Sequence, residues 1–147
     1  MKVWVLILFG FFATRPAWAD CWDHAERSFG IEARLLNAIA QVESGMNPVA
    51  VGKNRNGTYD YGLMQINSIH LPSLRKLGID AEVLKQDPCT SVLVGASILA
   101  DMMKIYGYSW EAVGAYNAGT AKNRHHLRMR YANKVWRIYQ QDRQDVA

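Results

Sequence analysis

The chain has 147 residues, half of them hydrophobic, with 17 Lys and Arg, 13 Asp and Glu, and a formal net charge of +4. Beyond the first 19 positions, which contain the basic residues Lys2 and Arg15, 128 residues remain with 15 basic and 13 acidic side chains, a net charge of +2. This charge is too small to indicate a nucleic-acid-binding protein. A chain of 128 residues is long enough for one domain with a real hydrophobic core.

The first 19 residues have the pattern of a secretory signal peptide. Lys2 provides a short positive region, residues 3–13 are an apolar run, and residues 17–19 form a small-x-small cleavage site preceded by Pro16. The apolar run is too short to span a bilayer. We therefore expect a cleaved signal and a mature chain that begins at Asp20 and has no membrane span.

The two cysteines, Cys21 and Cys89, are expected to form a disulfide. An even number of cysteines in an exported chain favours a bond, because the compartment is oxidising. Neither cysteine has the neighbours of a zinc site or of a CxxC redox motif. The sequence thus predicts a covalent link between the first mature residues and the start of a later helix.

The hydrophobic pattern predicts a mainly helical domain. Residues 91–106 are apolar nearly all round, as is typical of a helix in the middle of a bundle. The Gly-, Asn- and Pro-rich residues 47–58 are predicted to be an exposed loop, and residues 59–67 provide the only plausible small sheet. Helices are predicted at residues 20–29, 32–44, 71–77, 81–86, 91–106, 110–116 and 131–141.

Glu43 lies near the end of the predicted helix 32–44. Its helical face is otherwise apolar, with Leu36 and Ile39 in line with it, so we expect a partly desolvated carboxylate with a raised pKa. Gly45 is the expected helix stop, and the helix dipole also disfavours negative charge in the last turn. Both effects favour an acid that keeps its proton near neutral pH, as a general acid must. The alternative is a solvated Glu in a frayed turn.

Two later segments place polar and aromatic side chains among apolar ones. In residues 60–67, Gly62 permits close backbone approach, and Gln65 must find a partner or line a wet cleft. In residues 115–119, Tyr116 and Asn117 offer a ring and an amide that suit a sugar. Taken alone, a tyrosine such as Tyr116 is more often a core residue.

In this order, the segments resemble the motifs of the goose-type-lysozyme-like lytic transglycosylases, the SLT family. The family motifs are a Glu-Ser pair, Gly-Leu-Met-Gln-Ile, Ala-Tyr-Asn-Ala-Gly, and a later Tyr followed by Lys-Val. Here they are Glu43-Ser44, residues 62–66, residues 115–119, and Tyr131 with Lys134-Val135. The resemblance covers about residues 21–139. Size, signal and cysteine pair are most similar to the IagB/IpgF/EtgA group, small wall-cutting enzymes that serve type III secretion systems.

The resemblance implies a mainly α, lysozyme-like fold and a periplasmic enzyme that cleaves the β-1,4 bond between N-acetylmuramic acid and N-acetylglucosamine in peptidoglycan. Glu43 would protonate the leaving oxygen and then deprotonate the sugar's 6-hydroxyl, giving a 1,6-anhydro product, with no metal or cofactor. The implied partners are glycan strands and a type III secretion component, and we expect a monomer. The residues implied to bind substrate are Ser44, Gly62, Met64, Gln65, Tyr116, Asn117 and Tyr131.

Asp60 distinguishes this chain, because ordinary lytic transglycosylases use one carboxylate whereas lysozymes often place a second on the small sheet. Asp60 comes two residues before Gly62, and we interpret it as a catalytic carboxylate that stabilises an oxocarbenium-like transition state. A turn-capping Asp is the alternative. The chain also departs from the family ahead of Tyr131, where Leu127-Arg128 replaces the common Glu-Thr pair.

Three other functions stay open at this point. Water instead of the 6-hydroxyl as acceptor would make a lysozyme-like hydrolase. A non-catalytic glycan-binding module would keep the aromatic residues without needing Glu43. A structural adaptor for a secretion apparatus would use the basic stretch at residues 124–130 as its docking face. No nucleophile triad, Walker loop or HExxH motif supports another chemistry.

Overall fold

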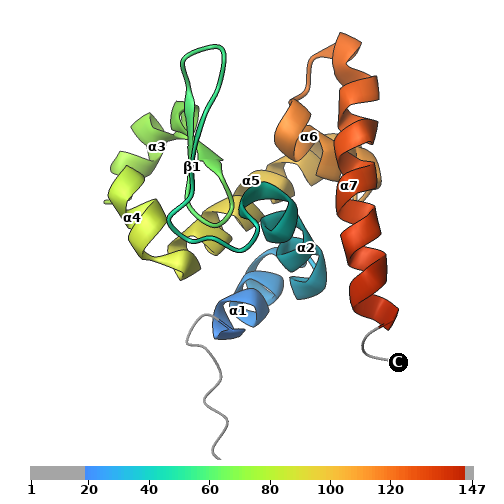
Figure 1. Ribbon diagram of the computed structural model, residues 1–147, viewed down its shortest axis with the longest axis horizontal. Coiled ribbons are helices and arrows are strands. Elements are labelled where there is room, and N and C mark those ends of the chain that lie inside the picture. Colours follow the sequence, from blue (N-terminus) through green and yellow to red (C-terminus); the bar gives the residue numbers. More distant parts are fainter. Residues whose placement is uncertain (1–18, 145–147) are drawn as a thin grey trace, which may run out of the picture.

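The computed structural model describes residues 19–144, which fold as helices around one small antiparallel sheet (Figure 1). The strands are β1 (Val51–Lys53), β2 (Tyr59–Tyr61) and β3 (Ile66–Asn67). Two 3-10 turns, η1 (Ser68–His70) and η2 (Lys122–Arg124), precede α3 and α7. The helices are α1 (Ala19–Phe29), α2 (Ala33–Ser44), α3 (Leu71–Arg75), α4 (Ala81–Gln86), α5 (Pro88–Tyr106), α6 (Trp110–Ala118) and α7 (His125–Gln144). The predicted mainly α fold with one small β insert is confirmed. The predicted signal peptide, residues 1–19, lies outside the described residues except for Ala19.

The helix α2 lies between two sides of the molecule. The sheet, α3 and α4 form one side, and α6 and α7 form the other (Figure 1). The helix α5 contacts α1, α4, α6 and β3, so it joins both sides beneath α2. Its position agrees with the prediction of a bundle-centre helix, because an all-round apolar helix must find neighbours on several faces. The C-terminal end of α2 therefore lies between the sheet and α7.

The sheet is larger than predicted, because residues 51–53 form a strand and not a loop. The strand β1 pairs with β2 so that Gly52 lies opposite Asp60, and β2 pairs with β3 so that Asp60 also lies opposite Asn67. Val51 is exposed, so β1 has no apolar alternation that would identify it as a strand. The consequence is that Asp60 occupies the central strand with a neighbour on each side.

The helices α5 and α7 begin several residues earlier than predicted. The helix α5 starts at Pro88 because the Asp87 side chain accepts a hydrogen bond from the backbone N–H of Thr90 at 3.2 Å, an N-cap that Pro in the first turn favours. The helix α7 starts at His125, six residues before the predicted position. Its first turns cross α6 so closely that a Cβ on Gly114 would overlap the backbone of Arg128.

The core forms where α2 packs against α5, α7 and the segment between β2 and β3. Gly62 has a φ of 79°, and a Cβ there would overlap the backbone carbonyl of Leu84 on α4. Close approach at this glycine brings residues 62–64 down onto α4 and α5. The fully buried large side chains of the core include Ile31, Leu36, Ile39, Leu63, Met64, Ile66, Leu84, Val92, Leu99, Val113 and Val135.

The disulfide between Cys21 and Cys89 is present, which confirms the predicted pair. The two Cα atoms are 5.2 Å apart, and the residues are 68 positions apart in the sequence. The bond ties α1 to the first turn of α5. Since α1 and α5 pack directly on each other, the bond fixes the N-terminal helix to the centre of the bundle.

Replacing both Cys21 and Cys89 with Ser should lower the free energy of unfolding by about 4 kcal/mol, because the unfolded chain regains the entropy that a closed loop of this length removes. Chemical denaturation at neutral pH measures the change. Wild-type protein treated with reductant is the matched control and should unfold with the double variant. Equal stability of variant and oxidised wild type would contradict the prediction.

Candidate active site

A polar cleft of about 640 Å³ opens at the C-terminal end of α2. This volume is in the range of ligand-binding sites. The cleft brings together five predicted site residues that come from three separate segments: Glu43, Asp60, Gln65, Tyr116 and Asn117. The other lining residues are Asn54, Arg55, Asn56, Thr58, Ile66, Asn67, His70, Ile98 and Arg124.

Glu43 is half-buried in the last turn of α2, which Gly45 ends in the left-handed conformation with a φ of 60°. Its pKa is raised from 4.5 to about 7, chiefly because burial disfavours the carboxylate. The hydroxyl of Tyr131 opposes this by donating a 2.5 Å hydrogen bond to Glu43 Oε1. The charge of Asp60 raises the pKa further, and Lys134 lowers it. Glu43 is therefore an acid that can hold or release a proton near neutral pH.

Asp60 is held on the wall formed by the sheet. Its Oδ2 accepts a 2.8 Å hydrogen bond from Asn54 Nδ2, and its Oδ1 accepts one of the same length from Asn67 Nδ2. Asn67 belongs to the neighbouring strand β3, and Asn54 belongs to the turn between β1 and β2. Both donate from their side chains and not from turn backbone. Because amide donors on both oxygens stabilise a carboxylate, the arrangement suits a fixed negative charge.

The Gln65 side chain fits beside Asp60 because the residue opposite Asp60 in the sheet is Gly52. A Cβ on Gly52 would lie 2.9 Å from Gln65 Oε1, so only glycine leaves room for Gln65. The Gln65 Nε2 donates to the carbonyls of Ala50 at 3.2 Å and Gly62 at 3.0 Å. Gln65 itself has a φ of 50°, which is uncommon for a residue with a side chain. It therefore both finds hydrogen-bond partners and lines the cleft.

Four predicted substrate-binding residues do not line the cleft: Tyr131, which instead bonds to Glu43, and Ser44, Gly62 and Met64. The Ser44 hydroxyl donates to the carbonyl of Leu63 at 2.7 Å, which ties the end of α2 to the segment behind the cleft. Met64 is fully buried, and its carbonyl accepts a 2.7 Å hydrogen bond from the Tyr116 hydroxyl. These residues hold Glu43 and Tyr116 in position from behind, without presenting side chains to a ligand.

The departure at Leu127-Arg128 leaves Tyr131 in contact with Glu43. Arg128 is only 4% exposed, and its Nη1 donates to the carbonyls of Gly119 at 3.2 Å and Ala121 at 2.9 Å. Its Nε donates to Glu111 Oε1 at 3.0 Å. Arg128 thus fixes the loop between α6 and α7. Tyr131 lies three residues further on and reaches across to α2.

The sequence interpretation missed Asn54, Asn67 and His70. The two amides belong to a stretch that reads as an ordinary polar loop and strand end, and only strand pairing brings both to Asp60. Burial lowers the pKa of His70 below its usual 6.5, although the charge of Asp101 acts in the opposite direction. Among residues 19–144, no group of three or more His, Cys, Asp or Glu is arranged to hold a metal ion.

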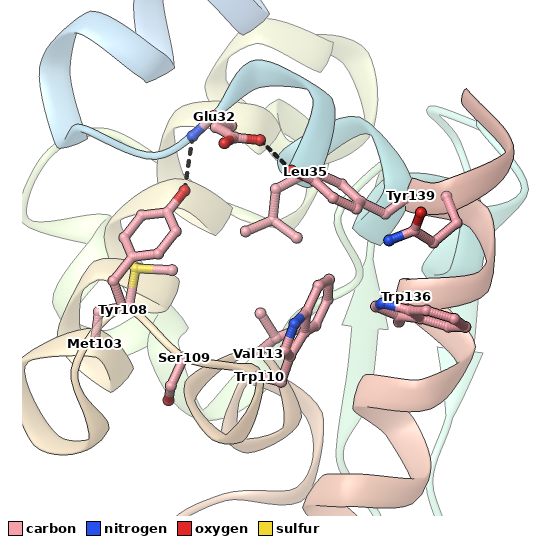
Figure 2. A pocket seen from close by; sticks show the side chains of 10 residues that line it. Glu32, Leu35, Met103, Tyr108, Ser109, Trp110, Val113, Trp136 and Tyr139 are labelled. Atoms are coloured by element: carbon pink, nitrogen blue, oxygen red, sulfur yellow. Dashed lines mark hydrogen bonds between the residues drawn. The ribbon is translucent and has the colours of Figure 1, made fainter. Parts of the chain in front are cut away.

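A second, aromatic pocket of about 280 Å³ lies at the other end of α2 (Figure 2). Its rings come from Tyr108, Trp110, Trp136 and Tyr139. The backbone N–H of Glu32 donates to the Tyr108 hydroxyl at 3.2 Å, and the Tyr139 hydroxyl donates to Glu32 Oε2 at 2.6 Å (Figure 2). Eleven positions separate Glu32 from Glu43, about 16 Å along a helix, so this pocket is separate from the polar cleft.

The chain that forms this polar cleft matches a known protein family and several known proteins. Residues 20–139 match the Transglycosylase SLT domain family. The chain is 59% identical over 139 residues to Invasion protein IagB of Salmonella typhimurium (strain SL1344), covering 95% of this chain and 87% of that protein. It is 49% identical over 121 residues to Protein IpgF of Shigella sonnei, covering 82% and 80%, and 42% identical over 142 residues to X polypeptide of Escherichia coli, covering 95% and 84%.

The fold and the cleft therefore define a lysozyme-like enzyme of the peptidoglycan-cleaving class. The chain belongs to the SLT transglycosylase family and is of the IagB/IpgF type, as the resemblance implied. Peptidoglycan as the family substrate implies that the chain acts outside the cytoplasm.

Replacing Asp60 with Asn should lower the pKa of Glu43 below about 7, because the negative charge of Asp60 is one of the causes that raise it. The basic limb of the pH profile of kcat/KM, where Glu43 loses its proton, should shift to lower pH. An NMR titration of the Glu43 carboxyl measures the same shift without activity. Asp23→Asn, on the exposed surface of α1, is the control, and an unmoved titration in Asp60→Asn would refute the coupling.

Replacing Tyr131 with Phe should have the opposite effect. The variant keeps the buried ring but removes the hydrogen bond that lowers the pKa of Glu43, so this pKa should rise above about 7 and the basic limb should move to higher pH. The same NMR titration measures it. A shift to lower pH in Tyr131→Phe would mean that the hydrogen bond is not the dominant effect of the phenol.

Proposed function

We propose that this chain is a lytic transglycosylase that cleaves the β-1,4 bond between N-acetylmuramic acid and N-acetylglucosamine, with Glu43 as its acid and base. The observation that carries the proposal is the buried carboxyl of Glu43, with a pKa of about 7, at the edge of a polar cleft. A general acid works best when its pKa is near the operating pH. The family membership supports the same class of reaction.

In the proposed mechanism, Glu43 donates its proton to the glycosidic oxygen as the bond from that oxygen to C1 breaks. The positive charge that develops on the sugar is stabilised by the carboxylate of Asp60. The Glu43 carboxylate then takes the proton of the sugar's 6-hydroxyl while the oxygen of that hydroxyl bonds to C1. This step gives the 1,6-anhydro ring and restores the protonated form of Glu43. The hydrogen bond from Tyr131 supports the charged form of Glu43 between the two steps.

Three other cleft residues, Gln65, Tyr116 and Asn117, have a proposed part in substrate binding. Tyr116 and Asn117 offer a ring and an amide to a sugar, and Gln65 lines the opposite wall. Burial, and then the charges of Glu43 and Asp60, raise the pKa of the Tyr116 hydroxyl well above its usual 10. That hydroxyl stays protonated and remains bound to the Met64 carbonyl, so the ring keeps a fixed orientation.

A lysozyme-like hydrolase is the second candidate, and the geometry of Asp60 favours it. Its two hydrogen-bonded oxygens hold a second carboxylate on the wall of the same cleft as Glu43. Two carboxylates across a cleft are the usual equipment of a hydrolase that activates water or forms a glycosyl intermediate. Mass spectrometry of released fragments separates the candidates, because a transglycosylase leaves 1,6-anhydro ends and a hydrolase leaves reducing ends.

We further propose that the enzyme works in the periplasm, after removal of residues 1–19, as a monomer that opens the wall locally for a type III secretion apparatus. The signal-like sequence and the cysteine pair support export. The secretion role is carried over from the resemblance to the IagB/IpgF group, one of whose members is named an invasion protein.

Replacing Glu43 with Gln should lower the rate of glycan release by about 10²-fold or more, the scale of general acid catalysis, because the amide has no proton to transfer. Turbidity loss and mass spectrometry on purified peptidoglycan measure it. Glu32→Gln, the same substitution at the opposite end of α2, is the matched control and should stay near the wild-type rate. Near-wild-type clearing by Glu43→Gln would end the enzymatic assignment of Glu43.

The loss in Glu43→Gln should not come from unfolding. Because the pKa of Glu43 is raised in the folded state, the contribution of this group to wild-type stability is fully present below pH 4.5 and is lost as the pH rises from 4.5 to about 7. The Gln side chain resembles the protonated form and does not cause this decrease. The variant should therefore melt at or above the wild-type temperature at pH 8, which thermal unfolding checks.

A further inference from the structure

Two arginines line the cleft from segments that are far apart in the sequence. Arg55 belongs to the turn between β1 and β2, and Arg124 is the last residue of η2. The hairpin turn and the start of α7 rise on either side of the C-terminal end of α2 (Figure 1). Both side chains are exposed, and both line the same cleft as Glu43 and Asp60.

The backbone that presents each arginine is fixed by its own hydrogen bonds. Around Arg55, the N–H of Asn54 donates to the carbonyl of Thr58 at 2.9 Å and the N–H of Gly57 to that of Asn54 at 3.1 Å. The N–H of Arg124 donates to the carbonyl of Ala121 at 3.0 Å. A fixed backbone under a charged side chain lowers the entropy that ligand binding must offset.

The bonds of Arg128 extend this support to the loop before η2. Arg128 Nη1 donates to the carbonyls of Gly119 and Ala121, and its guanidinium pairs with Glu111. The residue at which the chain departs from the common family pattern thus fixes the loop that leads to Arg124. Within residues 19–144, by contrast, neither Arg55 nor Arg124 forms an ion pair.

The charged groups of the cleft therefore differ in exposure, since Glu43 and Asp60 are half-buried whereas Arg55 and Arg124 are exposed. Glu43 and Asp60 supply the negative or ionisable groups, and the two guanidinium groups supply positive charge at the walls. His70, with its lowered pKa, is uncharged near pH 7. A ligand with neutral sugars and acidic branches fits this pattern, because its branches are repelled by Asp60 and attracted by the arginines.

We propose that Arg55 and Arg124 bind the carboxylates of the peptide stems on muramic acid residues, so that the enzyme prefers peptide-bearing glycan to bare glycan. This inference rests on the proposed function and names the substrate form for the same cleft. Guanidinium groups bind carboxylates through charge-assisted, often bidentate, hydrogen bonds. By holding the stems at the walls, the arginines set which bond of the strand lies next to Glu43.

The test compares two substrates made from one peptidoglycan preparation: strands freed of cross-links by an endopeptidase, and the same strands stripped of stems by an amidase. The double variant Arg55→Ala/Arg124→Ala should lose about tenfold in kcat/KM on peptide-bearing strands, mainly through KM, since partly exposed charge-assisted contacts have modest energies. On stripped strands, whose muramic acids keep only the lactyl carboxylate beside the ring, the change should stay below about twofold. Raising the salt concentration should reduce the wild-type preference.

Lys122→Ala is the matched control, because it removes a positive charge from the same 3-10 turn at a side chain that does not line the cleft. A second readout avoids catalysis altogether: in the Glu43→Gln background, the dissociation constant for peptide-bearing strands should rise about tenfold on loss of both arginines. Equal losses on both substrates, or no loss on either, would overturn the proposal. If wild-type protein cleaves neither substrate, the proposed function fails, whereas the binding readout still tests the arginines.

Discussion

The acidity of Glu43 and the packing of α7 against α2 both depend on the short hydrogen bond that Tyr131 of α7 donates to Glu43 of α2. Burial alone would raise the pKa of Glu43 further and leave an acid that rarely gives up its proton. The phenol, together with Lys134 of the same helix, offsets part of that cost. Because Tyr131 is almost completely buried, the bond also holds α7 against α2. One contact therefore sets both the acidity of the site and the spacing of the two helices.

The opposite wall uses rigid strand pairing for a different purpose. Glu43 is favoured in its protonated form, whereas Asp60 accepts hydrogen bonds on both oxygens, as suits a carboxylate. Two carboxyl groups held in such different surroundings can take different parts in one reaction. Glycine at position 52 makes room for this wall. The sheet of eight strand residues is small, but it fixes the geometry of the second carboxylate.

The departure from the family pattern at Arg128 lies close to the active site, and hydrogen bonds stabilise the buried side chain. Arg128 buries a charge, and its guanidinium bonds to Glu111 and to two carbonyls of the α6–α7 loop. A buried charge with several partners costs much less than an unpaired one. The result is an ordered entry to α7, with Arg124 at the end of η2 just before the helix and Tyr131 about two turns further along the chain.

The sequence alone determined the features that depend on local pattern: the apolar face that ends at Glu43, the Gly45 stop, the helices at residues 20–29, 32–44 and 81–86, and the cysteine pair. Tertiary structure decided the rest. The strand β1 exists because it pairs with β2, and the start of α7 is helical because it packs on Gly114. Asn54 and Asn67 meet Asp60, and Tyr131 meets Glu43 across 88 positions, only after the chain folds. Periodicity records which face is buried, whereas a hydrogen bond between distant polar side chains has no local signature in the sequence.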